Sequence, residues 1–147
     1  MVIKMKENIN ALDEMNKGCC MGMDAISFII EKVNDKNLKK SLKVQYNKYK
    51  DVRNKIEKLY PKYNEEDQPH ETNKMEKIMT YYGIEMKTMM DDSSSKIAEL
   101  LLKGTNMGII EGRRLLNNKE IDKKVNNLLE EYVQMQEDSV ENLKKYL

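Results

Sequence analysis

The residues of this chain whose types and spacing could do chemistry are sulfur-bearing. Met15, Cys19 and Met23 follow one another at steps of four, which places them on one face of a helix. Thiolate and thioether sulfur select cuprous copper, and a helical bundle can hold such an ion between its helices. Free Cys is also among the most buried residue types, and Met fills irregular gaps in protein cores. We therefore interpret these residues as a core stripe and keep soft-metal binding or storage as the alternative.

Conventional catalytic groups are sparse in this sequence. His70 is the only histidine, and it lies in a polar stretch over residues 62–71. Cys19 and Cys20 are adjacent on a predicted helix, where their side chains diverge by ~100° and cannot easily bridge each other. Neither thiol has a neighbouring base in the sequence that would activate it. The sequence thus predicts no catalytic residue and no cofactor, with a divergent enzyme as a second alternative.

Length and charge narrow the class of protein. A chain of 147 residues suits one domain with a continuous core. Acids and bases cancel to a net charge of +1, which argues against a nucleic-acid or anionic-membrane partner. Proteins that contact phosphates or base edges use Arg more often than Lys, whereas Lys greatly outnumbers Arg in this chain. We therefore interpret the Arg113-Arg114 pair as ordinary surface residues. No stretch has the pattern of a secretory signal or the length of a membrane span, so we expect a cytoplasmic location.

The elements that position these residues are helices. Apolar residues recur at alternating steps of three and four in five segments, and no strand pattern competes. The predicted helices cover about residues 8–33, 38–59, 73–90, 97–115 and 121–143. Asn and Asp residues over 34–37 indicate a turn, and the Asp-Ser cluster over 91–95 indicates a helix N-cap.

A repeated phrase predicts a duplication. Lys17-Gly18-x-x-Met21-Gly22 returns as Lys103-Gly104-x-x-Met107-Gly108, each time within a helix followed by a turn and a second helix. The single domain over 1–147 then consists of one hairpin over about 1–60, a crossover over 61–90 and a second hairpin over about 91–147. A crossover along the bundle brings the two first helices together antiparallel. We predict an all-α, ferritin-like four-helix bundle with a short extra crossover helix.

Glycines recur at steps of four inside these helices, although each costs ~1 kcal/mol relative to Ala. They are Gly18, Gly22, Gly104, Gly108 and Gly112. Small side chains let helices approach closely, so we interpret the glycines as a packing contact between the first helices of the two hairpins. The alternative is space for a ligand or a second subunit.

The site that this topology usually carries is missing. A di-iron bundle needs Glu-x-x-His on two helices, whereas the nearest analogues are Gln45-x-x-Lys48 and Glu131-x-x-Gln134. An ammonium has no lone pair for a metal. The sequence therefore argues against iron oxidation or storage.

Two further phrases carry a family resemblance. The chain resembles small bacterial ferritin-like proteins of unknown function that lack the di-iron ligands. The resemblance lies in the phrase Met21-Gly22-Met23-Asp24-Ala25-Ile26 together with the segment from Ile97 to Ile109. The resemblance covers nearly the whole chain. It implies the fold but no activity, and it transfers no catalytic residue.

A partner surface is predicted within the crossover. Tyr81, Tyr82, Met86 and Met90 belong to its densest aromatic and thioether stretch, and Met-rich helix faces are common interaction devices. We therefore expect a non-enzymatic protein of interaction or scaffolding that associates with itself, a dimer being favoured, or with another protein.

Overall fold

Four long helices form the described part of the chain. A computed structural model describes residues 2–64, 69, 91–118 and 120–147. Its long helices are α1 (Val2–Ile29), α2 (Lys36–Leu59), α5 (Ser94–Leu116) and α6 (Lys123–Leu143), and its short 3₁₀ turns are Ile30–Lys32, Tyr60–Lys62 and Lys144–Tyr146. No strand occurs in these described ranges. The predicted all-helical bundle is confirmed, while the predicted helix over 73–90 lies outside the described residues.

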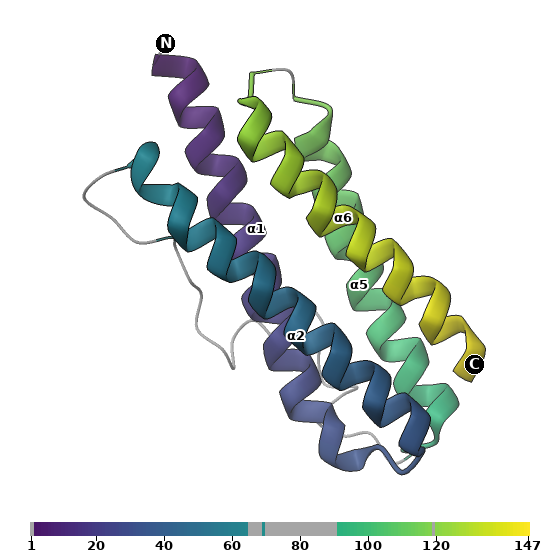
Figure 1. Cartoon of the computed structure of the whole chain (residues 1–147). Helices are drawn as coiled ribbons and strands as arrows, with labels where there is room; N and C mark the ends of the chain where they lie inside the picture. The colour runs from purple at the N-terminus through teal and green to yellow at the C-terminus, as the bar shows by residue number, and fades with distance from the viewer. Residues whose placement is uncertain (1, 65–68, 70–90, 119) are drawn as a thin grey trace.

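The helices pack as two hairpins, α1 with α2 and α5 with α6, laid side by side (Figure 1). α2 borders α6, and α1 borders α5. The backbone N–H of Asp122 donates to Asn8 Oδ1 at 2.8 Å, and the Asn118 amide donates to the Glu7 carboxylate. These bonds hold the turn between α5 and α6 against the start of α1. α1 and α5 therefore run in opposite directions, as Figure 1 shows.

Local signals in the sequence explain where two helices begin. The Asp35 carboxylate accepts from the N–H groups of Asn37 and Leu38 at 2.8 and 2.9 Å, which caps α2. Ser93 accepts from the Lys96 N–H at 3.3 Å and caps α5. Both predicted helix starts are confirmed.

The end of the first helix differs from the prediction. α1 ends at Ile29, and a 3₁₀ turn over Ile30–Lys32 leads to Val33 in extended conformation. The tighter turn aims Val33 into the core, where 4% of it is exposed, and its N–H donates to the Ile30 carbonyl at 3.2 Å.

The predicted apolar stripes form the core. Its largest fully buried apolar side chains come from all four helices and the turn after α2: Leu12, Met15, Ile29, Leu38, Val52, Ile56, Tyr60, Ile97, Leu129 and Leu143. In the part of the chain that was searched, every helix is too short or too polar to cross a membrane.

A hydrogen bond between Tyr63 and Asp122 ties the chain after α2 to the start of α6 and makes stability depend on pH. The Tyr63 hydroxyl donates to Asp122 Oδ2 at 3.0 Å. Partial burial and this contact with a carboxylate raise the pKa of Tyr63 from 10.0 to about 12. Since the folded pKa exceeds the unfolded one, the neutral phenol stabilises the fold below pH ~10, and the contribution disappears as pH rises towards ~12.

The Tyr63→Phe variant is therefore expected to unfold with a free energy about 1 kcal/mol below wild type at neutral pH. The difference should shrink above pH ~10 as the unfolded wild-type phenol ionises. Urea unfolding of both proteins at neutral and alkaline pH measures this. A difference that stays constant across the range would show that folding does not raise the pKa of Tyr63.

Candidate functional site

The three sulfur-bearing residues of the copper alternative lie together in the core. Met15 and Cys19 are fully buried, and Met23 is 7% exposed. Burial raises the pKa of the Cys19 thiol well above its usual value; the neighbouring Cys20 adds to the rise, and the Arg53 guanidinium opposes it. Because the thiolate is the metal ligand, this environment works against copper binding at Cys19. The structure favours the core interpretation of the stripe.

Alkylation tests the different environments of the two cysteines. Neither forms a disulfide, and Cys19 is buried whereas Cys20 is half-buried. We expect iodoacetamide to modify Cys20 in the folded protein and to modify Cys19 about 1,000-fold more slowly, because the buried thiol reacts only from an opened state. Mass spectrometry of Cys20→Ser and Cys19→Ser variants, with and without urea, measures the rates. Equal rates in the folded protein would contradict the burial of Cys19.

The helix glycines make room for side chains of α2 and α6. A Cβ on Gly22 would lie 2.5 Å from the Tyr49 ring, and one on Gly18 would meet the Tyr132 hydroxyl. A Cβ on Gly108 would meet the Gln136 amide, and one on Gly112 would lie 2.5 Å from the Val133 side chain. The predicted packing role is thus found at these four positions, and Gly104 is half-buried.

The partner predicted for the glycines was wrong. We expected the glycine faces of α1 and α5 to face each other, but the nearest side chains belong to α2 and α6. The physical reason is that a side chain of α2 or α6 fills the space at each of these four glycines, which leaves no room for close backbone approach between α1 and α5. Gly22 and Gly108, matched by the repeat, meet a tyrosine and a glutamine, so the two copies of the phrase do not pack identically.

The enzyme alternative needs a pocket between the glycine faces. The cavity beside Gly22 is lined also by Gln45, Tyr49, Thr105 and Ser139, among others, and has a volume of about 10 Å³. Such a volume holds about one water molecule. It is too small for a substrate.

The positions that would carry di-iron ligands are occupied by side chains that bond to other residues or are exposed. Gln45 is buried and donates to the Met135 sulfur at 3.9 Å, while Lys48 is exposed. Glu131 pairs with Lys55, and Gln134 donates to Asp138 at 3.0 Å. Among the residues that were searched, no three His, Cys, Asp or Glu side chains are grouped so that they could hold a metal ion.

A groove between α2 and α6 is a concave surface that sequence reasoning missed. It consists of three hollows, named here after one lining residue each. The Gln45 hollow is about 290 Å³, the Val52 hollow about 320 Å³ and the Leu128 hollow about 370 Å³. Lys48 and Asp138 line both of the first two, and Glu131 lines both of the last two, so the hollows adjoin along the helices.

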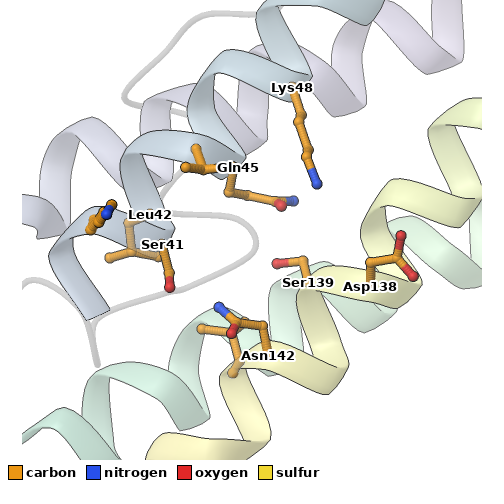
Figure 2. A pocket seen from close by; sticks show the side chains of 10 residues that line it. Ser41, Leu42, Gln45, Lys48, Asp138, Ser139 and Asn142 are labelled. Atoms are coloured by element: carbon orange, nitrogen blue, oxygen red, sulfur yellow. The ribbon is translucent and has the colours of Figure 1, made fainter. Parts of the chain in front are cut away.

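Polar side chains project into the Gln45 hollow from both helices (Figure 2). Gln45 and Lys48 come from α2, and Asp138, Ser139 and Asn142 come from α6. In the described ranges, no hydrogen bond joins Ser139 to a base that could activate its hydroxyl. Nucleophilic catalysis needs such a pair, so the hollow lacks an activated serine.

The two helices that border the groove carry opposite charge. α2 contains nine Lys and Arg but only two Asp and Glu, and α6 contains five Asp and Glu but only two Lys. The exposed lysines of α2 are Lys36, Lys40, Lys43, Lys48, Lys50, Lys55 and Lys58. Within the described ranges, Lys55 is the one member of this set in an ion pair, with Glu131 at 2.6 Å. The balanced total charge conceals a basic helix beside an acidic one.

The predicted partner surface at Tyr81, Tyr82, Met86 and Met90 lies outside the described residues. Comparison of the chain with models of protein families, with curated proteins and with solved structures gives no match. The resemblance to ferritin-like proteins therefore stays a prediction.

Proposed function

We propose that this protein is a non-enzymatic scaffold or interaction protein that works as a homodimer, with its α2–α6 face as the contact. The observation that carries the proposal is the pairing of a basic helix with an acidic helix on one grooved face. Complementary charges steer association and fix the register of an interface.

Symmetry makes this face complementary to itself. A twofold axis parallel to the helices sets the face of one copy against that of the other, with α2 of each over α6 of its partner. Lysines then face carboxylates on both sides. An axis across the helices would set α2 against α2, which repulsion between lysines disfavours. The charge pattern thus selects one of the two arrangements.

The size of the face suits a stable dimer. Helices of 24 and 21 residues are ~35 Å long, and two of them side by side are ~20 Å wide. Their face covers ~700 Å², close to the ~800 Å² per partner of a standard interface. Val44, which lines the Gln45 hollow and is 48% exposed, supplies apolar area between the charges.

The proposal includes the ferritin-like topology and a cytoplasmic location. The antiparallel course of α1 and α5 supports the topology, because the connection from Asn64 to Asp91 then joins opposite ends of the bundle. Cys19 and Cys20, which form no disulfide in the described ranges, support a reducing compartment.

Charge exchange between two exposed residues tests the dimer. Lys40 lies on α2, and Glu141 lies near the end of α6, next to Asn142, which lines the Gln45 hollow together with Lys40. We expect Lys40→Glu and Glu141→Lys singly to raise the dimer dissociation constant about tenfold, and the double variant to restore it to within ~3-fold. Sedimentation velocity over a concentration series, at low and high salt, measures the constants.

The control is Lys103→Glu, an exposed lysine on α5 away from this face, which should leave the constant unchanged. High salt should weaken the wild-type dimer, because exposed ion pairs are screened. A wild-type protein that stays monomeric at ~100 μM and low salt would overturn the proposal, since a standard interface binds more tightly than that.

A further inference from the structure

The Leu128 hollow concentrates positive charge at one end of the groove. Its volume is about 370 Å³, within the range of small-molecule sites. Four lysines line it, three from the end of α2 and its following turn and one from the start of α6: Lys55, Lys58, Lys62 and Lys124. Its one acidic lining residue is Glu131.

Most of this charge has no counterpart in the described ranges. Glu131 forms an ion pair with Lys55, with 2.6 Å between the carboxylate oxygen and the ammonium nitrogen. Lys58, Lys62 and Lys124 form no ion pair with any described residue. Side-chain contact with Lys124, and its charge, lower the pKa of Lys62. The ends of α2 and α6 therefore hold two like charges together, an arrangement that an anion between them would stabilise.

The start of α6 contributes to this positive charge through Lys124, which lies in the first turn of the helix. Its N-cap residue is Asp122, whose carboxylate accepts from the Tyr63 hydroxyl at 3.0 Å. Because that carboxylate offsets the partial positive charge of the helix end, the lysines and not the helix dipole carry the attraction for an anion.

The rest of the lining limits the kind of ligand. Leu59 and Leu128 give the hollow an apolar part, and Asn127 supplies an amide that can donate. Lysines bind phosphate as point charges. We propose that the Leu128 hollow binds a phosphorylated small molecule, its phosphate between Lys62 and Lys124 and a compact apolar group against Leu59 and Leu128. This site goes beyond the proposed scaffold role and does not require it. The hollow lies on the α2–α6 face that the proposed dimer contact would cover, so the ligand and the partner copy compete for it. Binding is therefore measured on protein that sedimentation velocity shows to be monomeric.

Calorimetric titration with pyrophosphate and phenyl phosphate tests the site, with sodium chloride at matched ionic strength as the blank. We expect saturable binding of one ligand per chain. Lys62→Gln with Lys124→Gln should weaken it about tenfold or more. The matched control, Lys40→Gln with Lys43→Gln, removes the same charge from the same basic face and should change affinity less than ~2-fold.

A second measurement separates the site from general attraction by a basic surface. Without ligand, the Lys62→Gln and Lys124→Gln variant should melt above wild type, because like-charge repulsion is relieved, and phosphate should then raise its melting temperature less. Equal weakening by both lysine pairs would overturn the proposal and assign binding to diffuse attraction for polyanions. Absence of saturable binding would also overturn it.

Discussion

Tyr49→Ala is expected to lower the free energy of unfolding by about 3–5 kcal/mol. The Tyr49 side chain is 4% exposed, and its ring occupies the notch left by Gly22. Gly22 has no side chain that could move into the space, and the 10 Å³ cavity beside it would merge with the void. The loss therefore falls in the upper part of the range for buried residues. Urea unfolding followed by circular dichroism measures it.

Two variants separate the ring from the hydroxyl. Tyr49→Phe keeps the ring and removes the hydroxyl with its long hydrogen bond to Gln136 Oε1, at 3.4 Å, so it should cost about 1 kcal/mol. Adding Gly22→Ala to Tyr49→Ala should restore up to ~1 kcal/mol, from better helix propensity and a smaller void. If Tyr49→Ala costs no more than Tyr49→Phe, the ring does not fill this notch.

Gly18→Ala is expected to destabilise the protein by about 1–3 kcal/mol, although alanine is the better helix former. The added methyl group would meet the Tyr132 hydroxyl, while the ring carbon behind that oxygen lies 3.0 Å away. Overpacking of a buried contact outweighs the ~1 kcal/mol that helix propensity offers. Thermal and urea unfolding give the sign directly.

Tyr132→Phe supplies the partner variant, because it removes the atom that the new methyl group would meet. In that background Gly18→Ala should be neutral or stabilising by up to ~1 kcal/mol. The double-mutant cycle then has a coupling energy of about 1–3 kcal/mol. Strictly additive effects would show that Gly18 and Tyr132 are not in contact.

Helix periodicity predicted the inward faces of this bundle well. The recurrence through Leu12, Met15 and Cys19 fixed which side of α1 is buried, and Asp35 and Ser93 marked the starts of α2 and α5. These signals are local, because one turn of helix and its cap contain all the residues involved. The choice of neighbour is not local. The glycine pattern indicated a small face on α1 but could not say that tyrosines of α2 and α6 fill it.

The groove was harder to predict, because total charge averages over the chain. The net charge of +1 argued against anionic partners of the whole chain. The exposed side of α2 is nevertheless strongly basic, and the exposed side of α6 is acidic. Counting charge by helix would have found this. The approach of Lys62 to Lys124 could not have been found in the same way, because it depends on how the ends of α2 and α6 meet.

The hydrogen bonds from Asp122 to Asn8 and from Asn118 to Glu7 have a consequence for biosynthesis. The packing of α1 is completed by contacts with a turn that is made long after it, the turn between α5 and α6. At roughly 5–20 residues per second, α1 waits about 5–20 s for that turn. During this interval the α1–α2 hairpin exposes the apolar side that later packs on α5 and α6, so the nascent chain depends on chaperones or on slow aggregation until the second hairpin emerges.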